Sequence, residues 1–374
     1  MSYDLYVELG SETQQDIEAL VKGSHRGMTV PAIFERIRLL TGIAARNESV
    51  RDYAVSGDRK KGGGYKSLVH KQGKPNETPY ANDLIEPNCA ILRDLGLLPG
   101  TPDLRHLPPG SWFLQFTFTL AKPWISKDDD PFYVAESVNP VRKDKVFKVP
   151  LMSASSWKGL LRWTAMHIRL ALKKDSLDPN RFAQQRFVQT LLFGDEKGEE
   201  PGQTKDFAAY LDALKPEARA EYERLLRAYY DLKTDDPLPH HSGRLMFYPT
   251  FFNLIDVEVI NPHSRKTKAG THPIYLECAP QGATGTFTLL YVPFDLIGQG
   301  EESMADEAKK HLRYLAPIIK GMFLTYGFSA KRTSGYGVAE DGIENLKIAT
   351  RAQPPEPKST SLSKLAQEVK DVRF

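Results

Sequence analysis

The chain has only two cysteines in 374 residues, and other common features are also scarce. Cys89 and Cys278 lie far apart and outside any metal-binding motif, which argues against a disulfide framework and a cysteine zinc site. The histidines show no HxxxH or HExxH spacing, so we predict no metal site. No apolar run is long enough to span a bilayer, and the N-terminus lacks a secretory signal. These absences predict a soluble, cytoplasmic protein without a membrane partner.

Neither sign of charge predominates in the chain, because the net charge is only +3 and the pI is about 8.6. Any basic surface must therefore come from local clustering. The apolar fraction of 41% is sufficient for a core, and the length suits two domains or one large domain with insertions. No internal repeat at a fixed period is visible.

The pattern of hydrophobic residues predicts an α+β domain with helices on one face of an antiparallel sheet and the other face free for a ligand. Residues 112–120 alternate between two faces and predict a half-buried strand. Helical spacing occurs at the N-terminus, after Ser155 or Ser156 as N-cap, in a pair broken at Pro216, and in a long helix kinked at Pro317. The predicted helices are 12–20, 33–40, 155–168, 207–232 and 304–326, and the further strands are 244–252, 256–260, 274–278, 286–292 and a short last one.

A basic stretch between residues 59 and 74 contains no acidic residue and predicts a flexible loop. Either a solvated insertion or an RNA contact explains such a charge run. The basic residues are Arg59, Lys60, Lys61, Lys66, Lys71 and Lys74.

A serine-rich helix start, PLMSASSWKGLLR at residues 150–162, is typical of an anion site. The first N–H groups of a helix lack intrahelical partners, and the helix dipole favours an anion beside them. The alternative is an ordinary capped helix with a solvated basic face. The candidate contacts are Ser153, Ser155, Ser156, Lys158 and Arg162.

Two further segments combine basic residues with exposed backbone. Residues 328–337, FSAKRTSGYG, place Lys331, Arg332 and Tyr336 in a glycine-rich turn that is able to approach a phosphate backbone. Residues 259–276 form two strand-like arms around a polar tip, which otherwise is simply a long hairpin loop. The tip carries Arg265, Lys266 and Lys268.

Taken in order, these segments resemble the RAMP superfamily, the backbone subunits of type III CRISPR effector complexes. The matching pieces are NPVRKD (139–144), PLMSASSWKGLLR (150–162), LFG (192–194), GRLMF (243–247), the hairpin at 259–276, APQGA (279–283) and the turn at 327–337. The set spans residues 111 to about 349, and residues 1–109 and the tail lie outside it.

The resemblance implies an RRM-like (ferredoxin-like) core within residues 110–350. It also implies a thumb hairpin at about 256–278. The hydrophobic pattern predicts a helical insertion at about 196–240 within this domain, and a largely helical accessory region (1–109) and a tail (351–374) flank it. Such a subunit holds guide RNA and wedges its thumb into the guide–target duplex. Its partners are then guide RNA, target RNA and other subunits of the complex.

Catalytic members of this family carry an aspartate immediately before the NPV motif, where this chain has Val138. Valine neither binds a metal nor accepts a proton, so we expect a holding subunit without a cofactor. The alternative is a metal-dependent endoribonuclease that uses Mg²⁺ and either Asp130 or Glu136. A third interpretation is an RRM-like RNA-binding protein outside CRISPR immunity.

Overall fold

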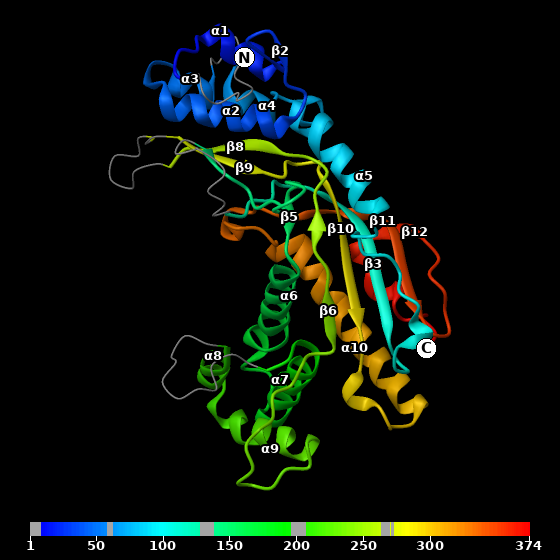
Figure 1. The fold of residues 1–374 in the computed structure, drawn as a ribbon. Helices are drawn as coiled ribbons and strands as arrows, with labels where there is room; N and C mark the ends of the chain where they lie inside the picture. The colour runs from blue at the N-terminus through cyan, green and yellow to red at the C-terminus, as the bar shows by residue number, and fades with distance from the viewer. Residues whose placement is uncertain (1–8, 58–62, 128–137, 196–206, 263–269, 271–272) are drawn as a thin grey trace.

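The computed structural model describes residues 9–57, 63–127, 138–195, 207–262, 270 and 273–374. Its centre is a five-stranded antiparallel sheet with the strand order β12-β11-β3-β10-β6 (Figure 1). Helices and strands together confirm the predicted α+β class. The strands of this sheet are β3 (Trp112–Leu120), β6 (Leu245–Phe247), β10 (Thr284–Tyr291), β11 (Ala339–Thr350) and β12 (Lys358–Ser361).

Strand β3 has the predicted bounds, but the prediction that it is half buried is wrong. Phe113 and Gln115 are buried as well as the residues that alternate with them. The reason is that residues 99–107 lie over them: Gln115 donates a hydrogen bond to the Pro99 carbonyl at 2.8 Å, and Phe113 packs in a small cluster with Leu104. One end of this sheet face is therefore closed, which corrects the expectation that the whole face is free.

The other end of the same face is polar. Its side chains follow from the register of β3 with β10 and β11, in which Thr119 pairs with Thr284 and Thr117 with both Thr286 and Glu344. All five are half buried or exposed. No aromatic side chain of the described strands lies among these positions, so the face offers no ring for stacking on a base.

Two helices cover the opposite, apolar face of the sheet, namely α6 (Ala154–Arg169) and α10 (Glu301–Gly321). The N-cap of α6 is Ser153 rather than the predicted Ser155 or Ser156, because the Ser153 hydroxyl accepts the hydrogen bond from the Ser156 amide. Helix α10 continues as a π-helical turn, Met322–Tyr326, and ends at Gly327 (φ +73°), as predicted. The strand that follows, β11, has twelve residues and is longer than the short strand expected.

The hairpin of β8 (Asp256–Ile260) and β9 (Ile274–Cys278) has the predicted strand bounds. A short strand, β4 (Val138–Asn139), pairs with β9 in parallel and completes a separate three-stranded sheet. A second small pair joins β5 (Leu151–Met152) to β7 (Thr250–Phe251).

The N-terminal helices lie beside this hairpin (Figure 1). Helices occur at both predicted places near the N-terminus, but the predicted loop at 59–74 is wrong where α4 forms, because Tyr65, Leu68 and Val69 are buried on one side of that helix. The glycines and lysines dominate the composition of this stretch, so its composition predicted a loop although one side of the helix is apolar. The elements are α1 (Gln14–Val21), β1 (Ser24–His25), β2 (Met28–Thr29), α2 (Ile33–Arg46), α3 (Arg51–Ser56), α4 (Gly64–Val69) and α5 (Glu86–Asp94).

A helical insertion extends from the far end of the core (Figure 1). The predicted pair broken at Pro216 is confirmed as α8 (Phe207–Leu214) and α9 (Arg219–Tyr229), whereas α7 (Pro179–Phe193) was not predicted. The C-terminal residues do not form a separate tail, because β12 adds an edge strand to the sheet and α11 (Leu365–Glu368) packs near α10.

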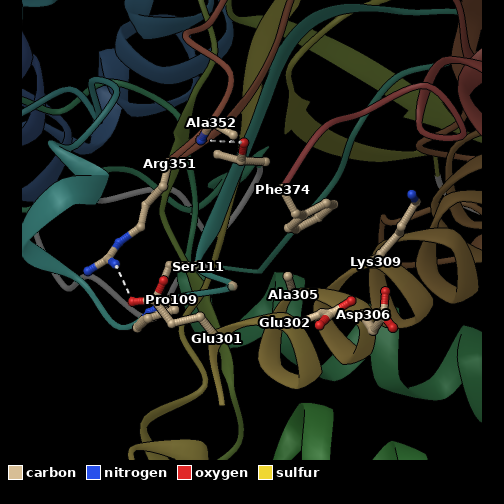
Figure 2. Close-up of a pocket in the computed structure, with 12 residues that line it drawn as sticks. Pro109, Ser111, Glu301, Glu302, Ala305, Asp306, Lys309, Arg351, Ala352 and Phe374 are labelled. Atoms are coloured by element: carbon tan, nitrogen blue, oxygen red, sulfur yellow. Dashed lines mark hydrogen bonds and ion pairs between the residues drawn. The ribbon is translucent and has the colours of Figure 1, made fainter. Parts of the chain in front are cut away.

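A groove of about 560 Å³ lies where β3 begins and β11 ends (Figure 2). The carboxylates of Glu301, Glu302 and Asp306 line it, and Arg351 lies 3.8 Å from Glu301. This concentration of carboxylates disfavours a phosphate ligand. Among the described residues, no helix combines the length and the apolar character needed to cross a membrane.

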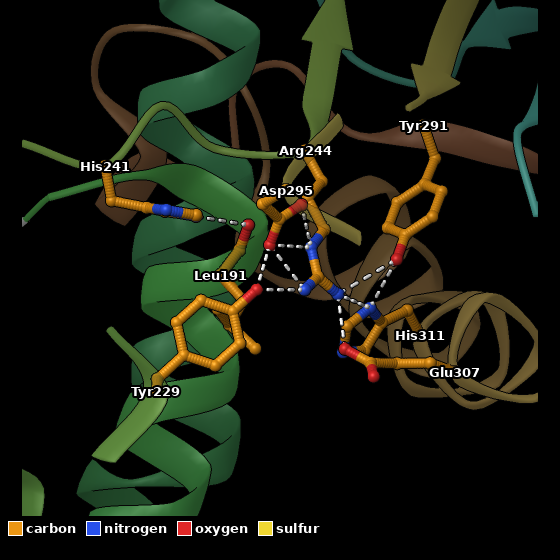
Figure 3. Close-up of polar contacts among 8 residues, drawn as sticks. All are labelled: Leu191, Tyr229, His241, Arg244, Tyr291, Asp295, Glu307 and His311. Atoms are coloured by element: carbon orange, nitrogen blue, oxygen red, sulfur yellow. Dashed lines mark hydrogen bonds and ion pairs between the residues drawn. The ribbon is translucent and has the colours of Figure 1, made fainter. Parts of the chain in front are cut away.

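A buried ion network joins the insertion to the core (Figure 3). The Arg244 side chain is only 1% exposed and contacts Asp295 at 2.6 Å and Glu307 at 2.5 Å. Tyr229 of α9 donates a hydrogen bond to Asp295 and accepts one from Arg244 at 3.0 Å. Although burial opposes ionisation, these bonds keep the pKa of Asp295 below its usual value. The network therefore fixes α9 against the loop between β10 and α10.

The network also predicts a pH dependence of stability. Burial, reinforced by the charge of Arg244, lowers the pKa of His311 to about 3, and its Nδ1 lies 2.9 Å from the Tyr291 hydroxyl. In the unfolded chain this imidazole binds a proton below its ordinary pKa of 6.5, so folding loses stability as the pH falls from 6.5 towards 3. We expect the Tm to fall over this range, and to fall less steeply for His311→Gln. Parallel slopes in thermal denaturation would contradict this assignment.

Candidate nucleic-acid interface

The N-terminus of α6 presents hydroxyl groups and the first backbone N–H groups of a helix. The Ser153 hydroxyl lies 3.0 Å from that of Ser155 and 2.9 Å from that of Ser156, and it accepts the Ser156 amide at 3.2 Å. No acidic residue occupies the first turn of the helix. The helix start therefore favours an anion without a competing carboxylate.

The glycine-rich turn (residues 327–337) is held in shape by hydrogen bonds to residues 123–125. The Ser329 hydroxyl accepts from the Ile125 amide at 2.7 Å, and the Gly337 amide donates to the Pro123 carbonyl at 2.8 Å. Trp124 donates its indole N–H to the Phe328 carbonyl at 3.1 Å. The backbone shape of the turn is thus set by the protein itself, which lowers the entropy cost of binding a ligand there.

Helix α6 and the glycine-rich turn pack directly against each other. The Trp157 and Phe328 rings lie 5.0 Å apart, and Tyr326 meets Trp163 edge-on at 5.6 Å. Two positions of α6 almost two turns apart thus contact the segment 326–328. The structure brings the serine-rich helix start and the glycine-rich turn together, as the sequence indicated.

The two neighbouring cations of the turn differ in their surroundings. Lys331 is exposed, in a left-handed backbone conformation (φ +57°). Arg332 instead stacks on the Trp163 ring at 4.4 Å, its Nη1 is buried without a hydrogen-bond partner among the described residues, and burial lowers its pKa. Lys331 is therefore the cation available to a phosphate, whereas Arg332 is partly a packing residue.

Tyr336 connects the turn to the thumb hairpin. Its hydroxyl donates to Glu258 of β8 at 3.0 Å, and burial together with this bond raises the pKa of Tyr336 to about 12. The hydroxyl is thus already engaged. Sequence reasoning missed Glu258, since nothing local marks a strand carboxylate as the partner of a residue 78 positions away.

Arg162 points away from this surface. Its guanidinium donates to the carbonyls of Asp195 at 2.8 Å and Gly194 at 3.3 Å, where α7 ends. Arginine is well suited to such orphan carbonyls at a helix C-terminus. Lys158 is half buried on α6 and stays a predicted phosphate contact.

Trp163 was not predicted as part of the site. It follows Arg162 in sequence but lies on a different side of α6, where it stacks with His167 at 5.0 Å and packs under Arg332. No local signal marked it, because a tryptophan at the border of an apolar stripe is ordinarily a packing residue.

Several predicted residues lie outside the described residues, and the structure does not place them. They are Asp130 and Glu136 of the nuclease alternative, and Arg265, Lys266 and Lys268 of the hairpin tip. Val138 is in β4, paired with Tyr275. Within the described ranges, no group of three or more His, Cys, Asp or Glu side chains is arranged to hold a metal ion.

The close packing of the turn gives a prediction for its glycines. A Cβ on Gly337 (φ +67°) would lie 2.3 Å from the Ser329 Cβ, whereas one on Gly335 (φ +81°) would meet nothing within 4 Å. We expect Gly335→Ala to cost about 1 kcal/mol through backbone strain alone, and Gly337→Ala about 3 kcal/mol. Urea denaturation of both variants tests this, and equal losses would show that the contact with Ser329 is unimportant.

Comparison with solved structures gives distant matches, and no curated protein matches the chain. A chain in the cryo-EM structure of the type III-B Cmr-beta bound to cognate target RNA is 12% identical, with a TM-score of 0.43 over 91% of this chain and 100% of that one. A chain of a type IV-B CRISPR complex is 13% identical, with a TM-score of 0.33 over 66% and 93%. The family model of the RAMP superfamily matches residues 131–340, more than half of the chain, and the protein therefore belongs to this superfamily.

Proposed function

We propose that this chain is a guide-RNA-binding backbone subunit of a type III CRISPR interference complex. The observation that carries the proposal is the preformed turn at 327–337 packed against the serine-rich start of α6. The two elements combine backbone N–H groups, hydroxyls and the exposed Lys331, which are the groups that bind a phosphate backbone. The other subunits of the complex and the target RNA are its further partners.

The core of this subunit is RRM-like. The chain order β3, α6, β6, β10, α10, β11 and the spatial order β11-β3-β10-β6 support a ferredoxin-like core, in which two helices cover one face of four strands. In many RRM domains aromatic residues on the open face stack bases. Here the open part of that face bears threonines, which offer no ring for a base. RNA is therefore held by the start of α6 and the glycine-rich turn instead.

The function is to hold RNA rather than to cut it. Val138, at the position where catalytic relatives carry aspartate, supports this role because valine provides neither a metal ligand nor a base. The hairpin β8–β9 is the thumb that wedges between bases of the guide–target duplex.

Removal of Lys331 tests the phosphate contact. We expect Lys331→Ala to weaken guide-RNA affinity about fivefold and to reduce the salt slope by about 0.7, the value for one phosphate on a single strand. Lys309→Ala is the matched control, because Lys309 lines the groove at the opposite end of the sheet. Affinity and salt slope are measured by fluorescence anisotropy over a salt series. If Lys331→Ala behaved as Lys309→Ala does, the proposed surface would be wrong.

A negative charge at the start of α6 separates binding from stability. Ser155→Asp places a carboxylate in the first turn, where it interacts favourably with the helix dipole and stabilises the fold by about 0.5 kcal/mol. The same charge repels a phosphate, so we expect guide affinity to fall while the Tm rises. Ser303→Asp, in the first turn of α10, is the control for an added negative charge away from the site, and we expect it to leave guide affinity unchanged. Undiminished RNA affinity in Ser155→Asp would exclude an anion site at this helix.

A further inference from the structure

The N-terminal region contacts the thumb hairpin through a buried carboxylate. Glu277 of β9 accepts hydrogen bonds from the Tyr65 hydroxyl of α4, from the Lys143 ammonium, and from the Val141 amide at 3.1 Å. The side chains of Lys143 and Glu277 are each 1% exposed. Burial of a carboxylate destabilises the fold unless hydrogen-bond donors compensate for the lost hydration, so each of these three donors contributes to stability.

Helix α4 and the residue after it reach both strands of the hairpin. His70 lies 2.5 Å from the Asp256 carboxylate, at the first position of β8. The Lys66 ammonium lies 4.7 Å from the centre of the Tyr275 ring in β9. With Tyr65 on Glu277, three side chains from residues 65–70 therefore engage both β8 and β9.

The contacts of Tyr65 and Tyr336 lie on opposite faces of the hairpin, whereas Asp256, the partner of His70, is on the same face as Glu258. The register pairs Val257 with Glu277 and Glu258 with Leu276, so that Glu258 and Glu277 project from opposite sides. Tyr336 holds Glu258 from one side, and Tyr65 holds Glu277 from the other. The hairpin is thus hydrogen-bonded on each of its two faces by a tyrosine hydroxyl.

The region also holds the segment that leads to α6. Tyr80 donates to the Lys148 carbonyl and Asn88 donates to the Phe147 carbonyl, both at 2.8 Å. Because five-residue strands in a small sheet are only marginally stable alone, outside support for this hairpin has a physical reason.

We propose that residues 63–95, and α4 above all, brace the thumb hairpin and set its direction relative to the RNA-holding surface. What the braced hairpin does to RNA rests on the proposed function, but the brace itself is a property of the protein alone. The residues that act are Tyr65 and His70, as positioning residues. This assigns a role to part of the accessory region that the sequence left open.

Hydrogen exchange of the full-length protein tests the brace. We expect Tyr65→Phe, which removes one hydroxyl, to speed exchange about tenfold in peptides from β8 and β9 and to leave β3 unchanged. His70→Leu, which keeps bulk and removes the donor to Asp256, changes β8 in the same direction. The matched control is Tyr53→Phe, because the Tyr53 hydroxyl bonds Glu18 at 2.6 Å within the N-terminal region itself.

Two results would overturn the brace. One is unchanged exchange in β8 and β9 of folded Tyr65→Phe and His70→Leu, and the other is an equal increase in Tyr53→Phe. The guide-RNA affinity of the same variants, measured by fluorescence anisotropy, distinguishes failure of the brace from failure of the proposed function. Faster exchange in β8 and β9 together with normal guide affinity supports the brace. If the wild-type protein binds no guide RNA at all, the proposed function is refuted, but the exchange result still decides whether the brace exists.

A second measurement follows the direction of the thumb. In the assembled complex, 2-aminopurine placed in the target where the thumb enters reports unstacking as increased fluorescence. We expect Tyr65→Phe to reduce this increase at least twofold at saturating guide, with Tyr53→Phe unchanged. An unaltered fluorescence increase, despite faster exchange in β8 and β9, would show that the brace does not direct the thumb.

Discussion

The packing of Trp157 is the interaction on which the rest of the structure depends. Its fully buried ring lies 5.0 Å from both Phe287 of β10 and Phe328 of the glycine-rich turn, and its N–H donates to Thr250 at 2.9 Å. One side chain of α6 thus joins the sheet, β7 and the turn. Burial of a tryptophan with its N–H satisfied contributes several kcal/mol, so the relative position of helix start and turn is determined by the core and not by a ligand.

A surface built on a rigid core explains why cations of similar appearance differ in their roles. Lys331 projects from a turn that is already fixed, so its charge is available to a partner. Arg332 and Arg162 instead stabilise the fold. Arg332 stacks on Trp163, and Arg162 donates hydrogen bonds to the carbonyls at the end of α7. A planar guanidinium suits both of these tasks better than an ammonium group does.

The hairpin β8–β9 shows the same principle outside the core. Tyr336 from the turn and Tyr65 from α4 each satisfy one strand carboxylate, on opposite faces. The hairpin is therefore coupled both to the glycine-rich turn and to the N-terminal helices. The Arg244 network performs a comparable task at the other end of the molecule, where it attaches the helical insertion.

Local patterns were sufficient for elements whose form depends on neighbouring residues. Alternation over 112–120 and strand-like composition over 256–260 and 274–278 predicted the bounds of three strands, and the serines and glycines marked both halves of the candidate site. Only the tertiary structure decided the closed end of the sheet face, the partners of Arg162, and the burial of Glu277 between Lys143 and Tyr65. Several of these contacts join residues more than 130 positions apart, and no local period carries information about such pairs. The sequence by itself thus determined which segments combine small residues with basic ones, and the packing around Trp157 decided which of their side chains remain exposed.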